Sequence, residues 1–354
     1  MMDRHMLSRY TPFGILFTSA PFMSMAITHL SSLEICAGAG GQALGLERAG
    51  FDHTATVELE DAACATLRLN RPAWNVLPLD IRNLNGKDYR GIDLLAGGVP
   101  CPPFSVAGKQ LGADDERDLF PTALRLVQES NPSAVLLENV PGLATARFAE
   151  YRRNVATKLT RWGYAVEWQV LNACNFGVPQ LRPRFVLVAL KRQWANHFIW
   201  PQPQGTPVTV GEALHDLMAS RGWRGAAKWA EKANAIGPTL VGGSKKHGGP
   251  DLGPSRARQG WSALGVEARS LSDLAPDASF PPNGVPRLTI RMAARIQGFP
   301  DNWSFAGRKT AAYRQIGNAF PPPVAHAIAQ SIRCALDGSA QMEEPTQGQL
   351  FLHA

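Results

Sequence analysis

Short apolar runs alternate with longer stretches of helical spacing along most of this chain. Runs that are apolar throughout are typical of strands buried on both faces of a parallel sheet. We predict strands at 32–36, 54–58, 92–96, 134–138, 165–171 and 184–190, and helices between them at 42–49, 62–69, 120–129 and 148–162. This alternation predicts an α/β fold with a mostly parallel, doubly wound sheet and helices on both faces.

The alternation ends after Lys191, where proline and glycine become frequent and periodicity is weak. Helical spacing returns at 289–297 and 323–334. We therefore predict one larger domain in two parts, 29–190 and 286–336, interrupted by a smaller loop-rich domain at 191–285. Two terminal segments complete the division: an N-terminal arm at 1–28, either disordered or an over-extended start before Met23 or Met25, and a flexible tail at 337–354.

Composition indicates a globular protein with a polyanionic partner. Apolar residues make up 45% of the chain and charged residues 18%, which suits a core-forming protein rather than a disordered one. The formal net charge is +7. The predicted insert at 191–285 holds eleven Lys and Arg against seven Asp and Glu, and five of the nine tryptophans. A basic insert facing a larger domain is consistent with nucleic-acid binding.

The cysteine and histidine patterns argue against disulfides and zinc. The five cysteines are scattered without a Cys-x-x-Cys pair, which fits a reducing compartment, and the eight histidines show no ligand spacing. No apolar stretch approaches the ~20 residues of a membrane span. The short run at 13–17 faintly resembles a secretory signal, although no clear cleavage site follows. We expect a cytoplasmic, nucleoid-associated protein of bacterial or phage origin, with no membrane partner.

Two predicted strand ends carry candidate chemistry. Cys101 follows the strand at 92–96 and is held between prolines, while Glu138 closes the strand at 134–138. Because parallel neighbouring strands end at one edge of a sheet, a thiol and a carboxylate would share one crevice there. Taken alone, Cys101 would more often be an inert core cysteine than a nucleophile.

A glycine-rich turn follows the first predicted strand and precedes the first predicted helix. Gly38, Gly40 and Gly41 would let the backbone approach a ligand closely. Glu58 lies twenty residues after Gly38, at the end of the next strand, where a carboxylate can accept hydrogen bonds from ribose hydroxyls. Because the turn also satisfies the loose dinucleotide fingerprint, an NAD-dependent oxidoreductase remains a competing interpretation at this point.

A set of motifs, in chain order, resembles the cytosine-C5 DNA methyltransferases of the bacterial restriction-modification type. The motifs are Pro-Cys-Pro-Pro-Phe-Ser at 100–105, Glu-Asn-Val at 138–140, Gln-Leu-Arg-Pro-Arg at 180–184 and Gly-Asn-Ala at 317–319. The resemblance spans roughly residues 30–332 and is specific because the whole set occurs in order. It implies a Rossmann-like S-adenosylmethionine-dependent methyltransferase domain, and it makes the insert at 191–285 a target-recognition domain.

The resemblance also implies a cofactor site for S-adenosylmethionine, with S-adenosylhomocysteine as product and no metal. In the family the turn holds the cofactor, the residue at Glu58 binds ribose, and Asp80 with Ile81 contacts the adenine. The residues carried over are Cys36, Ala37, Gly38, Gly40, Gly41, Glu58, Leu59, Asp80, Ile81, Gly98, Pro100, Leu119 and Asn318. One departs from the pattern, since the family usually has Phe at the position of Cys36, and the residue that replaces its packing is not evident.

The implied catalytic residues are Cys101, Glu138, Arg182 and Arg184. Cys101 would add to C6 of cytosine as a thiolate, which makes C5 nucleophilic. Glu138, protonated through burial, would contact N3 and the N4 amino group, and the two arginines would orient the carboxylate and the base. The arginines could instead be ordinary phosphate contacts. The target cytosine must rotate out of the duplex to reach the thiolate.

The expected partner is double-stranded DNA, bound by a monomer, with a cognate restriction endonuclease left open. Two further functions remain as alternatives. An RNA cytosine-5 methyltransferase would share this architecture, although the sizeable insert argues against it, and a DNA-binding relative without catalysis would lack the intact set of catalytic residues. The sequence does not reveal the recognition site.

Overall fold

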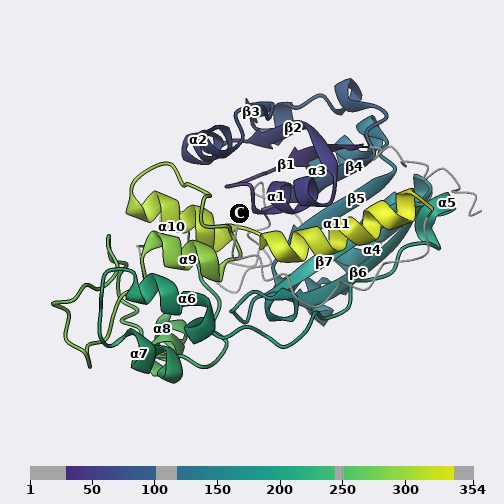
Figure 1. The fold of residues 1–354 in the computed structure, drawn as a ribbon. Helices are drawn as coiled ribbons and strands as arrows, with labels where there is room; N and C mark the ends of the chain where they lie inside the picture. Colours follow the sequence, from purple (N-terminus) through teal and green to yellow (C-terminus); the bar gives the residue numbers. More distant parts are fainter. Residues whose placement is uncertain (1–28, 101–117, 244–248, 250, 339–354) are drawn as a thin grey trace, which may run out of the picture.

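A computed structural model describes residues 29–100, 118–243, 249 and 251–338. In this part of the chain a seven-stranded sheet has the order β3-β2-β1-β4-β5-β7-β6 (Figure 1). The strands β1 to β5 are parallel, and β7 pairs antiparallel with both β5 and β6. The bounds are β1 Leu30–Ile35, β2 Phe51–Glu58, β3 Val76–Pro78, β4 Leu94–Gly98, β5 Ala134–Asn139, β6 Tyr164–Asn172 and β7 Pro183–Lys191.

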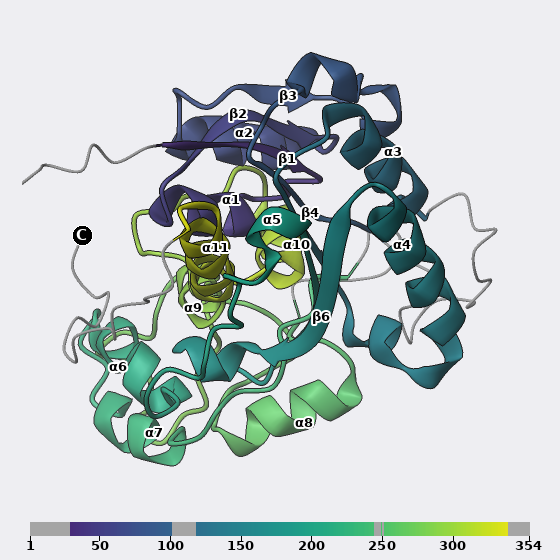
Figure 2. The same ribbon diagram turned by 90° about the vertical axis from the view of Figure 1, so that its right-hand side faces the viewer.

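Helices cover both faces of the sheet, as Figure 2 shows in the view along its edge. On one face, α3 (Phe120–Ser130) and α4 (Ala149–Arg161) pack on side chains such as Leu95 and Leu137. On the other face, α1 (Gly41–Arg48) and α11 (Pro322–Leu336) pack on Ala96 and Leu136. Successive strand residues point to opposite faces, so burial on both faces requires the continuous apolar runs seen in the sequence.

The predicted strands and helices of the larger domain are confirmed, with bounds shifted by a few residues. The sequence interpretation missed β3, which has three residues and ends in Pro78. It also missed α10 (Lys309–Asn318). The remaining short elements before the insert are α2 Asp61–Asn70, η1 Ile81–Asn83, η2 Gly86–Tyr89, η5 Pro141–Ala144, η6 Ala146–Phe148 and η7 Ala173–Phe176, and the one-turn helix α5 Arg192–Ala195 opens the insert.

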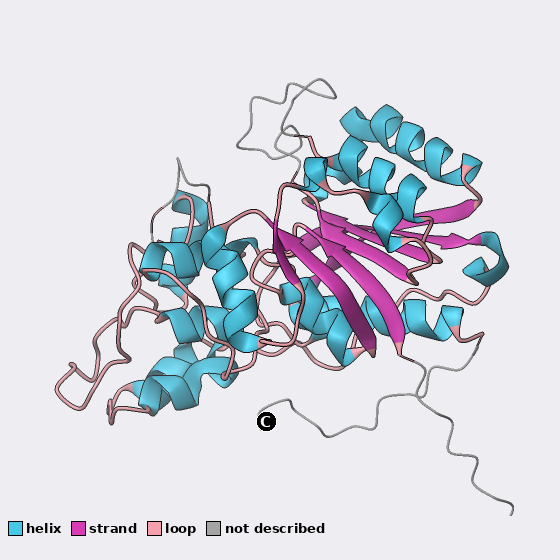
Figure 3. Ribbon diagram, turned by 90° about the horizontal axis from the view of Figure 1, so that it is seen from above, coloured by secondary structure: helices cyan, strands magenta, loops and turns pink. Residues whose placement is uncertain are grey.

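The insert contains helices and not only loops. Besides α5, its helices are α6 (Val210–Ala219), α7 (Ala226–Lys232) and α8 (Ser255–Ala263), which lie apart from the strands in Figure 3. Most of the described residues between 191 and 285 lie outside these short helices, as expected of a loop-rich segment. A capping box marks the start of α6, because the Thr209 hydroxyl accepts from the Glu212 N–H while the Glu212 carboxylate accepts from the Thr209 N–H. This Thr-x-x-Glu spacing was the available sequence signal.

The apolar core of the insert continues into the chain's last third. Leu214, Trp229 and Trp261 belong to the same cluster as Met292 of α9 (Ile290–Ile296) and Tyr313 of α10. In Figure 1, α9 and α10 lie between the insert and the sheet. The division at residue 285 stays a prediction, but the packing across it is continuous. The N-terminal arm at 1–28 and nearly all of the predicted tail lie outside the described residues.

Among the described residues, the helices are all too short or too polar to cross a membrane.

Candidate active site

Glu138 is the last residue but one of β5, at the carboxyl edge of the parallel strands and directly beside the end of β4. The register pairs Gly98 with Glu138. A Cβ at Gly98 would lie 3.1 Å from Oε2 of Glu138, so glycine leaves the carboxylate room. The next residues lead to Pro100, which lines the same pocket as Glu138. Cys101 lies outside the described residues. The strand pairing nevertheless confirms that β4 runs toward the edge where Glu138 stands.

The backbone that leads to Cys101 is fixed by Asn139. Its side-chain amide donates to the carbonyl of Val99 over 2.8 Å, and its own oxygen accepts from the Val140 N–H. Beyond the segment that is not described, the N–H of Leu119 donates to the carbonyl of Pro100 over 3.4 Å. The Asn of the Glu-Asn-Val motif therefore positions the strand end that carries the candidate nucleophile.

Glu138 is a buried carboxylate paired with a buried guanidinium. Nε of Arg184 lies 2.8 Å from Oε1 of Glu138. Burial raises the pKa of Glu138 above its ordinary value, although Arg184 and then Arg182 act in the opposite direction. The loss of water around the carboxylate outweighs its partners because both groups are desolvated. Glu138 is thus poised to hold a proton more readily than an exposed glutamate.

Arg182 does not contact Glu138 in the way that Arg184 does. Its side chain is fully buried, and its two terminal nitrogens donate to backbone carbonyls of Leu240, Gly317 and Ala319. It precedes β7, so the expectation that both arginines alternate on one strand holds only for Arg184. The predicted role of Arg182 in orienting the base stays a prediction. Its observed contacts hold the backbone of separate chain segments together.

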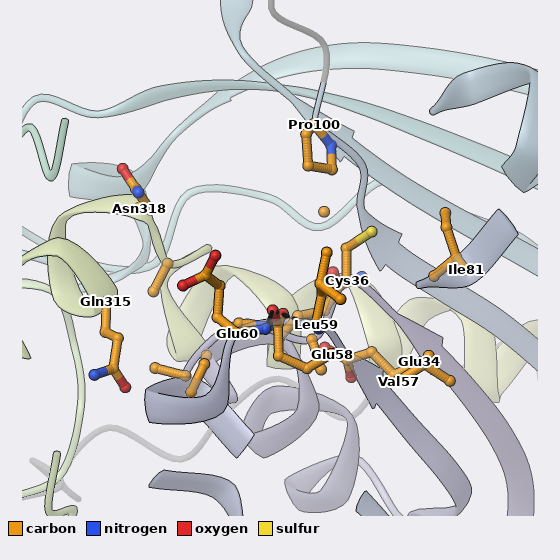
Figure 4. Close-up of a pocket in the computed structure, with 18 of the residues that line it drawn as sticks. Glu34, Cys36, Val57, Glu58, Leu59, Glu60, Ile81, Pro100, Gln315 and Asn318 are labelled. Carbon is orange, nitrogen blue, oxygen red and sulfur yellow. Dashed lines mark hydrogen bonds between the residues drawn. The ribbon is translucent and has the colours of Figure 1, made fainter. Parts of the chain in front are cut away.

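A cavity of about 370 Å³ extends from Glu138 along the carboxyl edge of the sheet. Pockets of ~300–1,000 Å³ are typical of cofactor and small-ligand sites. In Figure 4, Pro100 lies across the cavity from Glu58 and Leu59, with Asn318 and Ile81 on opposite sides. All of the predicted cofactor residues line this cavity except Gly40.

The glycine-rich turn has the backbone conformation that its sequence predicts. Gly38 and Gly40 have φ of 55° and 84°, in the left-handed region. A Cβ at Gly41 would lie 2.3 Å from the carbonyl oxygen of Phe320, so the turn packs closely on the chain's last part. Gly40 faces away from the cavity, where a Cβ would meet Leu67 and Trp303. Glycine is needed at this position because of the positive φ of the turn and the close packing against Leu67 and Trp303.

Glu58 closes the glycine-rich turn through backbone donors. Oε2 accepts from the Gly38 N–H over 2.7 Å, and Oε1 accepts from the N–H groups of Leu59 and Glu60, each over 2.8 Å. A carboxylate offers about four lone-pair positions. Three are used within the protein, which leaves one for a ligand. Glu58 therefore shapes the cavity as well as facing it.

The far end of the cavity is formed by η1 and by Cys36. Asp80 caps η1, accepting from the Arg82 N–H, and the Arg82 guanidinium lowers the pKa of Asp80. Cys36 is a non-glycine residue with positive φ, 53°. Burial, helped by the nearby carboxylates of Glu58 and Asp80, raises the pKa of the Cys36 thiol. A thiol kept protonated packs as a small apolar group.

Two buried polar side chains in the cavity wall were missed by the sequence interpretation. Glu34 is fully buried at the end of β1, and Gln42 is buried in the first turn of α1. Neither carboxylate oxygen of Glu34 and neither amide atom of Gln42 has a hydrogen-bond partner among the described residues. Burial raises the pKa of Glu34 well above its ordinary value, with an opposing effect from the Ala43 backbone. In the sequence, the only indication was the glutamate near the end of the apolar segment that forms β1.

Another wall of the cavity comes from α10, which the sequence interpretation did not predict. Arg314, Gln315 and Asn318 line the cavity from this helix and its end. Within the described residues, no group of three or more His, Cys, Asp and Glu side chains is placed to hold a metal ion.

Comparison with solved structures places this fold in a known class. A crystal structure of a Spodoptera frugiperda DNMT2 variant superposes with a TM-score of 0.60 at 18% identity, covering 86% of this chain and 99% of that one. The sheet differs from the dinucleotide-binding order 3-2-1-4-5-6 by the antiparallel β7 inserted before β6. Fold and cavity define a Rossmann-like α/β protein with a ligand-sized cavity at the carboxyl edge of its parallel strands.

Sequence comparison then identifies the family. The family described as C-5 cytosine-specific DNA methylase matches residues 30–334, and this chain belongs to it. The Type II methyltransferase M.NaeI of Lentzea aerocolonigenes is 57% identical over 312 residues, covering 87% of this chain and 76% of that protein. The Type II methyltransferase M.NgoMIV of Neisseria gonorrhoeae is 54% identical over 314 residues, covering 86% of this chain and 98% of that protein. The protein is a DNA cytosine methyltransferase, and the dehydrogenase interpretation is set aside.

Proposed function

We propose that this protein transfers a methyl group from S-adenosylmethionine to C5 of a flipped-out cytosine within a specific sequence of double-stranded DNA. The observation that carries the proposal is the position of Glu138. It is buried against Arg184, it stands beside the strand that leads to Cys101, and it lines the cavity of the glycine-rich turn. A base held by Glu138 would therefore lie at the mouth of the cofactor cavity.

The cavity suits S-adenosylmethionine, which supplies an electrophilic methyl group on a sulfonium sulfur. Its walls hold two buried polar side chains, Glu34 and Gln42, whose side-chain atoms lie within hydrogen-bonding geometry of no other described residue and could be satisfied by a polar amino-acid end. The glycine-rich turn leaves the backbone close to the cavity, and Glu58 keeps one acceptor position for a ribose hydroxyl. Asp80 and Ile81 line the end where the adenine would lie.

The proposed chemistry begins with the flipped cytosine between Cys101 and Glu138. The Cys101 thiolate forms a bond to C6, and the electron pair of the C5–C6 double bond becomes available at C5. Glu138 donates its proton toward N3 as charge develops there, and it accepts from the N4 amino group. C5 takes the methyl group. A base then removes the proton from C5, the C6–sulfur bond breaks, the thiolate leaves as the double bond re-forms, and N3 returns its proton to Glu138.

The insert at 191–285 is the proposed reader of the DNA sequence. Its basic balance suits phosphate contacts, and arginine or lysine side chains would read guanine in the major groove. We place the enzyme in the bacterial cytoplasm with the nucleoid, acting as a monomer on DNA without a metal. A cognate restriction endonuclease fits the Type II names of its relatives.

A mechanism-based adduct tests the nucleophile. Bisulfite sequencing of DNA from a host that expresses the protein would first identify the methylated cytosine. A short duplex with 5-fluorocytosine at that position should then form a denaturation-resistant adduct with the enzyme, because fluorine cannot leave as a proton does. The adduct should require S-adenosylmethionine for full yield and should map to the peptide containing Cys101. An adduct on Cys36, Cys64, Cys174 or Cys334, or normal turnover by Cys101→Ser, would refute the assignment.

Parallel assays with duplex DNA and transfer RNA test the substrate class. Tritium from labelled S-adenosylmethionine should enter DNA and not RNA, since the insert provides a large recognition surface beside the active site. Efficient transfer to RNA alone would contradict the DNA assignment.

A further inference from the structure

The Gln-x-Arg part of the motif at 180–184 forms a buried junction between the insert and the chain's last part. We use the name QR junction for Gln180, Arg182, Leu240, Gln297 and the backbone of 317–319. Gln180, Arg182 and Gln297 are each fully buried. Burying a polar side chain costs free energy unless it is hydrogen-bonded. The hydrogen-bond partners of these three residues therefore show which segments the junction connects.

Arg182 connects three chain segments through its terminal nitrogens. Nη1 donates to the Leu240 carbonyl over 2.8 Å, and Nη2 donates to the carbonyls of Gly317 and Ala319 over 2.7 and 2.9 Å. The two carbonyls on Nη2 belong to the residues on either side of Asn318. The guanidinium therefore fixes the backbone that carries Asn318, because a planar fork of donors restrains the peptide groups that it binds.

Gln180 and Gln297 extend the same arrangement. The Gln180 amide donates to the Ile296 carbonyl over 3.0 Å and to the Gln297 side-chain oxygen over 2.7 Å, and its oxygen accepts from the Leu240 N–H over 3.0 Å. The Gln297 amide donates to the Ala319 carbonyl. Leu240 is thus held at both its N–H and its carbonyl, and the carbonyl of Ala319 receives two donors.

Next to the junction, the insert packs so closely on the cavity wall that neither Gly242 nor Gly317 has room for a side chain. A Cβ at Gly242 would lie 2.5 Å from the Arg314 carbonyl oxygen and 2.7 Å from Oδ1 of Asn318. A Cβ at Gly317 would lie 2.3 Å from the Gly242 nitrogen. The Asn318 amide donates to the Gly243 carbonyl over 3.2 Å. Asn318 is therefore supported by the insert from outside and by Arg182 through its own backbone.

We infer that Arg182 is a positioning residue, which seats Asn318 in the cofactor cavity and makes the segment 240–243 of the insert the outer support of the cavity wall. The inference rests on the proposed function, since it takes the cavity as the S-adenosylmethionine site. It assigns Arg182 to cofactor affinity, whereas Arg184, in contact with Glu138, belongs to the base. The two arginines of one motif then serve two different ligands.

The test separates affinity for the cofactor from turnover. Equilibrium dialysis with labelled S-adenosylhomocysteine would measure binding to the free enzyme, and tritium transfer to the duplex identified by bisulfite sequencing would give KM and kcat. Arg182→Met should weaken S-adenosylhomocysteine binding and raise the KM for S-adenosylmethionine by about tenfold, a typical size for an energetic coupling between neighbouring groups. At saturating cofactor, kcat should fall much less. Arg182→Lys should recover part of the affinity, because lysine keeps donors for the carbonyls.

Two further variants keep the inference falsifiable if Arg182→Met is unstable. Gly242→Ala should produce the same change in cofactor affinity, since its Cβ would displace Asn318, although Arg182 is intact. Arg333→Met is the matched control. Arg333 also donates to two backbone carbonyls, those of Ala49 and Gly50, but it lines neither the cavity nor the junction. It should lower stability without changing cofactor affinity.

A double-mutant cycle then links Arg182 to Asn318. If Arg182 acts through Asn318, the combined Arg182→Met and Asn318→Ala variant should bind S-adenosylhomocysteine little more weakly than Asn318→Ala alone. Additive losses would overturn the inference, as would an Arg182→Met enzyme with normal cofactor affinity and a collapsed kcat. If the wild-type protein binds no S-adenosylhomocysteine, the proposed function fails and the inference fails with it. If it binds and methylates DNA but Arg182→Met and Gly242→Ala leave affinity unchanged, only the inference fails.

Discussion

Nε of Arg184 lies 2.8 Å from Oε1 of Glu138, and both side chains are nearly excluded from solvent. Burial favours the neutral form of both partners, since it raises the pKa of Glu138 and lowers the pKa of Arg184. An ion pair of this kind is sensitive to what covers it, because each charge depends on the other for stabilisation. A base placed against Glu138 would add a hydrogen-bond partner to a carboxyl group whose raised pKa favours its protonated form.

Replacing Glu138 with glutamine should separate base recognition from proton donation. Glu138→Gln can still donate to N3 and accept from the N4 amino group, but it cannot release a proton as charge develops in the ring. Turnover should fall by about 10²–10³, in the range of general acid catalysis. Affinity for S-adenosylhomocysteine should stay near the wild-type value. Glu150→Gln, on the exposed side of α4, is the control and should leave both quantities unchanged. Loss of cofactor affinity with normal turnover would contradict the assignment.

Replacing Glu58 should weaken cofactor binding more than it weakens recognition of the base. Glu58→Ala removes the acceptor of three backbone N–H groups around the turn as well as the proposed ribose contact. We expect S-adenosylhomocysteine affinity, measured by titration calorimetry, to fall at least tenfold, which corresponds to about 1.4 kcal/mol. Glu231→Gln, an exposed change in the insert, serves as control. If Glu58→Ala and Glu138→Gln weaken cofactor binding equally, this division of labour is wrong.

Glu34 should make the protein less stable as pH rises. Its pKa in the folded state lies well above the ordinary value of 4.5, chiefly because of burial. Between these two values the folded protein binds more protons at this site than the unfolded chain, so the free energy of unfolding falls with increasing pH in that window. Glu34→Gln removes this contribution. The stability of the variant relative to wild type should therefore increase by up to about 1.4 kcal/mol for each pH unit above 4.5, until the folded pKa is reached.

Urea unfolding of both proteins at several pH values in that window, without cofactor, would measure the change. The exposed Glu150→Gln variant should follow the wild-type pH dependence. A constant difference between Glu34→Gln and wild type across the window would show that Glu34 is ionised in both states.

Exchange of the insert should transfer sequence preference. A chimera in which residues 191–285 of this protein replace the corresponding segment of a related methyltransferase should methylate this protein's site, as read by bisulfite sequencing. Because Trp261 and Leu214 share a core with Met292 and Tyr313, that chimera should be less stable than one that also carries α9 and α10. A chimera that folds and keeps its host's preference would refute the role of the insert.

The sequence by itself determined the sheet and its chemistry. Strands buried on both faces are largely apolar, so β4, β5 and β7 were visible as continuous runs, and the ends of β4 and β5 marked the edge shared by Gly98 and Glu138. The glycines of the turn were visible because Gly38 and Gly40 adopt positive φ. The ordered motifs then indicated the family, to which the chain belongs.

Only the tertiary structure decided how the insert packs against α9, α10 and the cavity wall. The helices α6 to α8 are short, and their stability comes from a core shared with α9 and α10 rather than from their own periodicity, so local patterns predicted loops. Arg182 and Arg184 look equivalent in sequence, since they are two residues apart in one motif. Their roles diverge because Arg184 meets Glu138 across the sheet, whereas Arg182 meets carbonyls from Leu240, Gly317 and Ala319. Contacts between residues so distant along the chain depend on how the layers pack, which no local spacing of residue types specifies.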